Sequence, residues 1–370
     1  MDYVDVLKSP EVRSQQEVNL ANIYANQHER LDNFVFMYAV PSNLLKKFGI
    51  EIYSGRGYLL LFGIYFVTVF IPGLLITALT SQWMEMTPLR LAIVAAVLSA
   101  LNVIVLIIGQ VAAYKISALH RLLRGVEEIQ ALIQWDRRWF GPRISALMGG
   151  IISAAFLVIL YLLNLEVDRI QLPATILWVC TVIAIFLGQF SFSTMMIFFE
   201  FRKLSTRQFE LYRLNPYDTF HIQRTSAGLK QLGLVSTVSL PFFLLVLLTV
   251  LPEGSSLNVP ITAGFLLMCY MATAIGILFP LGFLGNIVKV AKWQLLGPIQ
   301  AELNHLAPRL LSLSKEDYEH FIRLQTVYQT IKDTKDSFLG FSAVARIGGT
   351  VLLATISVLL PAVIQRYLLK

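Results

Sequence analysis

Within the long apolar segments of this sequence, the side chains that could take part in binding or hydrogen bonding are mostly neutral and polar. One segment contains the run GQFSFST at positions 188–194, and Gln110 and Asn286 lie near the ends of two others. Amides and hydroxyls in such places either join helices by hydrogen bonds or line a polar path. The candidate pore-lining residues are therefore Gln110, Gln189, Ser193 and Asn286, and hydrogen bonding between helices is the alternative for each.

Ionisable side chains, in contrast, form no catalytic motif. The glycine-rich nucleotide-binding motifs, the HExxH zinc motif and the GxSxG motif of serine hydrolases are all absent. The histidines are scattered and none falls inside an apolar segment; they are His28, His120, His221, His305 and His320. The sequence therefore predicts no catalytic residues, no cofactor and no metal site, and a protein that is not an enzyme.

The interiors of the apolar segments also lack charged residues. Glu200 lies at the end of one segment, after Phe198-Phe199 and before Arg202, where an interfacial anchor is the plain interpretation. A proton-coupled carrier needs carboxylates or histidines within the membrane. The pattern therefore disfavours a proton-driven pump.

The elements that position these side chains are seven long apolar blocks. The chain is 56% hydrophobic and only 14% charged, whereas soluble domains carry about 25% charged residues. A helix of about 20 apolar residues crosses the ~30 Å hydrocarbon core of a bilayer and satisfies its own backbone hydrogen bonds. The predicted fold is an all-α transmembrane bundle of three hairpins and a C-terminal helix. Its blocks are Tyr58–Leu79, Leu91–Ala113, Ile144–Asn164, Pro173–Phe199, Leu232–Leu251, Val259–Val288 and Ile347–Ile364.

Basic residues set the orientation of this bundle. The region before the first block and alternate loops after it hold 26 of the 30 Lys and Arg residues, which marks them as cytoplasmic. The N-terminus is therefore predicted to be cytoplasmic and the C-terminus outside. The predicted cytoplasmic parts are 1–57, 114–143, 200–231 and 289–346; the hairpins are 58–113, 144–199 and 232–288, and 347–370 holds the seventh crossing.

The same distribution accounts for the net charge of +7 without a nucleic-acid partner. Anionic lipid headgroups at the cytoplasmic face are the expected partners of these residues. The chain contains no Asn-x-Ser/Thr sequon, which favours a bacterial inner membrane over a glycosylating compartment.

Two of the cytoplasmic parts carry apolar stripes at helical spacing. The stripe in 114–143 starts where the second crossing ends, with no breaker between them, so this crossing is predicted to continue as one helix until Gly141-Pro142. In 289–346, Gly297-Pro298 and Pro308 are expected to interrupt the helix, and Ser314 with Asp317 to cap a new one.

Because these stripes are apolar, we expect another protein surface to cover them. They pack either on one another, as a cytoplasmic helical bundle, or on a partner protein or a second copy of the chain. The candidate partner-docking residues are Ile116, Leu119, Leu123, Val126, Phe321, Leu324 and Val327.

Glycines and prolines predict close packing and bends. Gly149-Gly150 and Ser153-Ala154 place small residues at a spacing that lets two membrane helices approach closely. Proline inside a helix removes a hydrogen bond and bends the helix. The candidate hinges are Pro72, Pro241, Pro280 and Pro361, and fixed bends are the alternative.

The layout resembles, in topology alone, the inverted seven-helix chemoreceptor channels of insects. This resemblance implies a pore-forming ion channel, and the uncharged crossings with their polar clusters fit one that is a homo-oligomer gated through its cytoplasmic helical layer. Two alternatives remain open. One is a membrane scaffold or anchor subunit that docks a cytoplasmic partner through the stripes, and the other is a carrier for a neutral small molecule.

Overall fold

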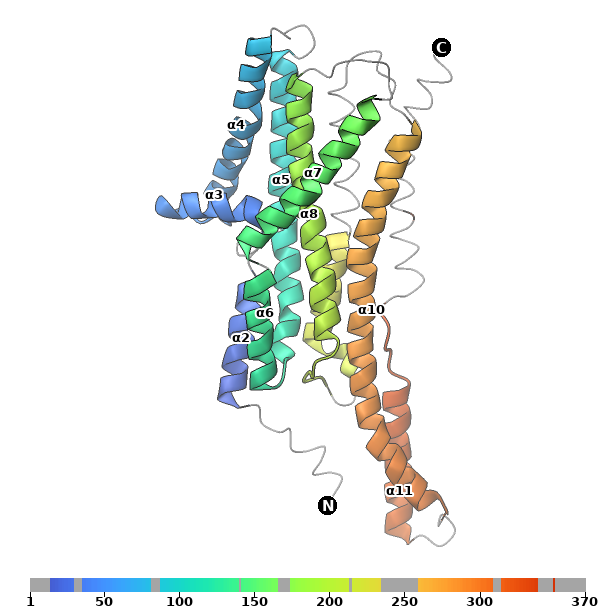
Figure 1. Ribbon diagram of the computed structural model, residues 1–370. Coiled ribbons are helices and arrows are strands. Elements are labelled where there is room, and N and C mark those ends of the chain that lie inside the picture. Colours follow the sequence, from blue (N-terminus) through green and yellow to red (C-terminus); the bar gives the residue numbers. More distant parts are fainter. Residues whose placement is uncertain are drawn as a thin grey trace.

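The computed structural model is an elongated bundle of helices (Figure 1). It describes residues 14–29, 35–80, 87–139, 141–165, 174–212, 215–233, 259–308, 314–338 and 349. These residues form no strand; an isolated antiparallel bridge joins Leu123 and Phe209. The all-helical fold class is therefore confirmed for the described part of the chain.

The helices follow the chain in a simple order. They are α2 (Gln15–His28), α3 (Phe36–Lys47), α4 (Gly55–Thr80), α5 (Pro88–Ile116), the 3-10 helix η2 (Ser117–Leu122), α6 (Val126–Trp139), α7 (Pro142–Leu165), α8 (Ala174–Leu204), the 3-10 helix η3 (Pro216–Asp218), a helix over 220–233, α10 (Val259–Leu306) and α11 (Lys315–Lys332).

Within the described residues, three helices are long and apolar enough to cross a membrane: Gly55–Thr80, Pro88–Leu122 and Ala174–Leu204. Most exposed side chains of α4 are apolar, as lipid contact requires; they include Leu59, Val67, Ile71, Leu75 and Leu79. These helices indicate a membrane protein. Nearly all of the predicted blocks Ile347–Ile364 and Leu232–Leu251 lies outside the described residues, as do the candidate hinges Pro241 and Pro361.

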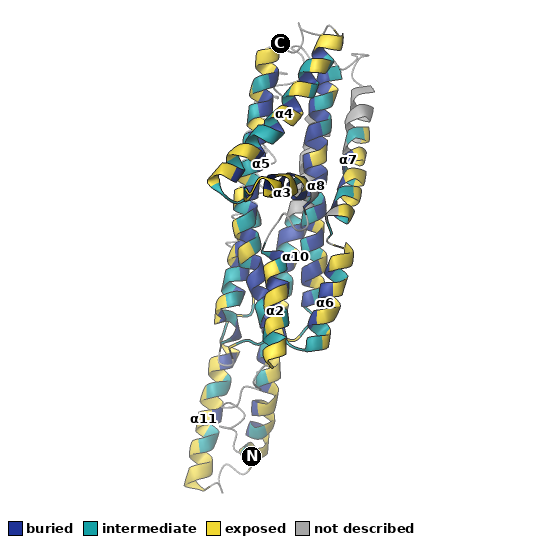
Figure 2. Ribbon diagram, turned by 90° about the vertical axis from the view of Figure 1, so that its left-hand side faces the viewer, coloured by how far each residue is buried: buried dark blue, intermediate teal, exposed yellow. Residues whose placement is uncertain are grey.

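Helix α8 lies at the centre of the bundle. It packs against α7, α4 and α10, and α4 also packs against α5. It is the most buried of the three candidate spans and α4 is the least, as the colouring in Figure 2 shows. Helix α3 lies across the bundle axis, between the part that contains α4 and the part that contains α2 and α6 (Figure 1).

Small residues allow α7 and α8 to approach closely, as their spacing predicts. A Cβ at Gly188 would lie 2.5 Å from the carbonyl oxygen of Gly149 and against the hydroxyl of Ser153. A Cβ at Gly149 would in turn meet the amide of Gln189. Gly150, the other glycine of the pair, has open space around its Cβ position.

The prediction of one continuous helix from the second crossing to Gly141-Pro142 is wrong. Helix α5 ends at Ile116, η2 follows, and Gly125 takes a left-handed conformation with φ +84° before α6 begins. Glycine adopts this conformation without the steric cost that a Cβ would bring. The chain therefore turns back at Gly125, and the stripe of 116–133 is divided between separate elements.

The prediction that Gly297-Pro298 interrupts a helix is also wrong, because α10 continues through Pro298 and Pro280 for 48 residues. It ends at Leu306, just before Pro308. The predicted cap of the next helix is confirmed: the Ser314 hydroxyl accepts a hydrogen bond from the backbone N–H of Asp317 at 3.1 Å. Together α10 and α11 form a hairpin that extends beyond the rest of the bundle (Figure 1).

The close packing of α7 on α8 leads to a testable prediction. Replacing Gly188 by Val should lower the free energy of unfolding by about 1–3 kcal/mol, the usual cost of overpacking. The matched control Gly150→Val introduces the same side chain into open space and should cost less than about 1 kcal/mol. Denaturant titration of the purified protein in detergent measures both, and equal losses would contradict the packing described.

Candidate functional site

Four ionisable side chains meet below the centre of the bundle, in what we call the basal layer: α2, η2, α6 and the adjoining end of α8. The side chains are His28, His120, Asp136 and Glu200, and all four are buried. Each comes from a different element of the basal layer. Their meeting therefore depends on how these elements pack.

Local sequence explains how α2 reaches this position. Ser14 and Glu17 form a reciprocal capping box that starts α2, and His28 is its last residue. Helix α2 packs on η2 and α6, where Tyr24 is fully buried in an apolar cluster with Leu119, Leu132 and neighbouring residues. The η2 turn points His120 toward the same place from the end of α5.

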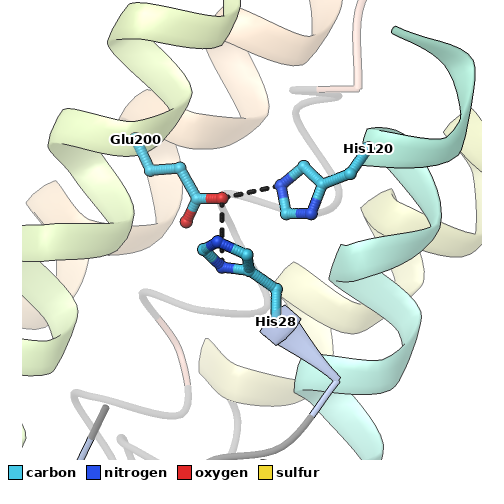
Figure 3. Close-up of side chains that lie close together, drawn as sticks. All are labelled: His28, His120 and Glu200. Carbon is cyan, nitrogen blue, oxygen red and sulfur yellow. Dashed lines mark ion pairs between the residues drawn. The ribbon is translucent and has the colours of Figure 1, made fainter. Parts of the chain in front are cut away.

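One oxygen of the Glu200 carboxylate faces both imidazoles (Figure 3). Its Oε1 atom is 2.6 Å from His120 Nε2 and 3.5 Å from His28 Nδ1. The other nitrogen of His28, Nε2, lies 2.9 Å from Asp136 Oδ2. One His28 ring thus bridges two carboxylates.

Aromatic contacts hold both imidazoles in place. The Tyr24 ring lies 4.8 Å from the His28 ring and 4.6 Å from the His120 ring, measured between centroids. The two imidazoles are themselves 4.6 Å apart in a T-shaped arrangement. Neither ring can rotate far without displacing Tyr24, so the cluster is geometrically restrained.

The carboxylates determine the charge of His28. Burial alone would lower the pKa of its imidazole, but the nearby carboxylates of Glu200 and Asp136 outweigh burial and raise the pKa from 6.5 to about 9. Burial, reinforced by the same two carboxylates, raises the pKa of Tyr24 well above its usual value. The cluster therefore favours a cation at His28 and keeps Tyr24 neutral.

A cavity of about 80 Å³ adjoins the cluster. His28, His120 and Glu200 form one part of its wall, and Ser193 and Met196 of α8 form another. The volume exceeds the roughly 10–15 Å³ that one water molecule needs. The cluster therefore borders a space that small ligands can occupy.

The candidate pore-lining residues do not share one surface. Gln189 is buried and joins α8 to α7, since its Oε1 accepts from the Ser145 hydroxyl at 2.9 Å and its Nε2 donates to the Ser145 carbonyl at 3.0 Å. Gln110 donates to the Glu29 carbonyl, and Asn286 is exposed on α10. Ser193 is the one of the four that lines the cavity described above.

The candidate docking residues are largely used within the chain. Ile116, Leu119 and Leu123 are buried in the apolar cluster of the basal layer. Leu324 is buried against α10 in the hairpin, with Phe321 and Val327 packed beside it. The two stripes therefore lie in separate apolar clusters, the first packed with α2, α8 and α10 and the second packed on α10 alone.

Sequence reasoning missed this cluster. The interpretation of Glu200 as an interfacial anchor is wrong, because its side chain is only 4% exposed and faces inward. The expectation that the histidines are scattered is wrong for His28 and His120, which lie side by side. The available signal was Glu200 itself, an acid that follows an apolar run without a helix break.

Comparison with protein-family models, with curated proteins and with solved structures found no match to this chain. The geometry of the cluster is therefore the basis for assigning a role to it.

Loss of the shared carboxylate should destabilise the protein. We expect Glu200→Gln to lower the free energy of unfolding by about 3–5 kcal/mol, because it leaves buried polar partners without their counter-charge. The matched control is Glu302→Gln, which breaks a His–Glu pair of 3.0 Å with His320 that is about one-third exposed. Surface pairs contribute about 0–1 kcal/mol, so similar losses in denaturant titrations of the two variants would contradict this account.

Proposed function

We propose that the protein is a pore-forming ion channel, assembled as a homo-oligomer and gated through its cytoplasmic helical layer. The observation that carries this proposal is the attachment of α8 to the basal layer. The central candidate membrane-spanning helix carries Glu200 near its end, and His28 and His120 hold it there. A displacement of α2 or η2 would therefore act directly on the helix at the centre of the bundle.

In this proposal seven helices cross the membrane and the basal layer lies in the cytoplasm. Helix α3 supports that placement, since Val40, Leu44 and the C-cap residue Phe48 expose apolar side chains and Lys46-Lys47 lie in its last turn. An amphipathic helix with this composition lies in the plane of a membrane surface. It would mark the cytoplasmic boundary just where α4 begins.

Helix α10 supports gating from the cytoplasmic side. Its 48 residues correspond to about 72 Å at 1.5 Å per residue, far more than the ~30 Å hydrocarbon core. The helix thus continues from an apolar block into the hairpin with α11 as one element. In the proposed channel, a movement of the hairpin reaches the membrane through this helix.

A second candidate function, the docking of a cytoplasmic partner, is favoured by the hairpin surface. Large apolar side chains are exposed on both of its helices; they are Val290, Trp293, Tyr318 and Ile322. A scaffold would use this surface and would need no pore. A carrier for a neutral small molecule has the cavity beside Ser193 in its favour.

Ion flux separates the channel from the scaffold. We expect purified protein in liposomes to pass ions under imposed cation or anion gradients, and Leu324→Asp to change the flux at least several-fold because it separates α11 from α10. The control Ile322→Asp places the same charge on the exposed face of α11 and should leave the flux unchanged. Flux no higher than in empty vesicles, for the wild type and both variants, would contradict the channel.

A further inference from the structure

The most specific arrangement in the molecule is the convergence of His28, His120 and Glu200. One potential ligand atom of each residue lies within 4.8 Å of the other two. In a zinc site the ligand atoms lie about 2.0–2.2 Å from the ion, which places neighbouring ligands about 3.3 Å apart in tetrahedral geometry. The contacts of Glu200 Oε1 with His120 and His28, 2.6 and 3.5 Å, lie on either side of that value.

Hydrogen bonding accounts for the contact of His28 with Asp136 but only poorly for the contacts of Glu200. His120 Nε2 and Glu200 Oε1 form a close ion pair, but neither atom makes a hydrogen bond of normal geometry, and the buried His120 Nδ1 has no hydrogen-bond partner either. Buried polar atoms in native proteins are nearly always satisfied. Ligand lone pairs that point at a common ion, rather than at each other, produce this combination of closeness and poor hydrogen-bond alignment.

Asp136 contacts the ring nitrogen of His28 that does not face Glu200. Histidines that bind a metal usually donate their other ring N–H to a carboxylate, which fixes the tautomer and the ring orientation. Asp136 Oδ2 lies 2.9 Å from His28 Nε2, so Nδ1 is the nitrogen that faces Glu200, and its lone pair becomes available when an ion displaces the proton of the imidazolium. Tyr24 packs on both imidazoles and restrains them further.

Charge and ligand chemistry identify the class of ion. The carboxylates of Glu200 and Asp136 bring two negative charges into a buried place, and a divalent cation balances both. Imidazole nitrogens suit zinc and similar transition metals, whereas calcium and magnesium prefer oxygen ligands. Three protein ligands leave a further coordination position, and the cavity beside Ser193 gives room for a small ligand there.

We propose that His28, His120 and Glu200 bind a divalent transition-metal ion of the zinc class, with Asp136 orienting His28. This inference goes beyond the proposed channel and does not rest on it. The ion would join α2, η2 and α8 at one point, and its open position would face the cavity. It would also explain why four ionisable groups are gathered where a helical layer needs none.

The test uses full-length purified protein in detergent, stripped with a chelator and titrated with Zn²⁺ by calorimetry and with Co²⁺ by visible absorption. We expect one ion per chain, and a Co²⁺ spectrum with the intense ligand-field bands of a four- or five-coordinate site. Zn²⁺ should also raise the melting temperature, because a ligand that binds only the folded state stabilises it. Mg²⁺ should do neither.

Variants then locate the ion. His120→Gln and Glu200→Gln should each weaken Zn²⁺ binding by more than the about 10–100-fold that loss of an orienting partner costs, and Asp136→Asn should fall within that range. The matched control His320→Gln removes a histidine from the more exposed pair with Glu302 and should keep wild-type affinity. Size exclusion and circular dichroism confirm folding; if a variant does not fold, the wild-type stoichiometry and Co²⁺ spectrum decide.

Absence of stoichiometric Zn²⁺ binding by the wild type at micromolar concentration would overturn the proposal and leave a cluster held by a shared proton. A weak Co²⁺ spectrum typical of a hydrated surface ion would overturn it as well. So would wild-type affinity in the folded Glu200→Gln protein. None of these results depends on whether the protein conducts ions.

Discussion

The buried carboxylate of Glu200 needs polar partners because water does not reach it, and this requirement determines how the basal layer is assembled. Burying an ionised carboxylate costs several kcal/mol unless good partners compensate, and Glu200 is almost wholly buried. Its partners come from the last residue of α2 and from the turn after α5, so the same point of α8 draws in segments that are far apart in the chain. The apolar cluster of Tyr24, Leu119 and Leu132 then closes around them. Packing alone would not require these elements to meet at Glu200, but its charge does.

Much of the fold could be predicted from the sequence, because uninterrupted apolar blocks leave the backbone few alternatives to helices. The α7–α8 contact was also predictable, since the spacing of the small residues Gly149 and Ser153 is itself the mark of a close approach between helices. The predicted helix ends were wrong where tertiary packing or a single backbone dihedral angle determines whether a helix continues. Gly125 ends a stripe that looks continuous, because its positive φ reverses the chain. Pro298 does not break α10, and the burial of Leu296 and Ile299 against α11 offsets the hydrogen bond that it removes.

The candidate site could not be predicted in the same way. His28, His120 and Glu200 are separated by 92 and 80 positions in the sequence, and local spacing carries information only about neighbours on one helix. Which histidine meets which acid depends on the reversal at Gly125 and on the packing of α2, and neither is visible as periodicity. The polar residues that did attract attention in the sequence, such as Gln189, bond neighbouring helices instead. Isolated ionisable residues at the ends of apolar helices are therefore better signals than polar residues within them.

The central claim is that the shared carboxylate holds α2 in the basal layer and so connects that layer to α8. Hydrogen–deuterium exchange with peptide-level mass spectrometry tests it most directly, by comparing wild-type protein with Glu200→Gln. The account predicts slow exchange along Gln15–His28 in the wild type, faster exchange along the same helix in the variant, and unchanged exchange in α11, which belongs to a separate apolar cluster. Equal exchange of α2 in the two proteins would show that apolar packing alone holds this helix and would contradict the account.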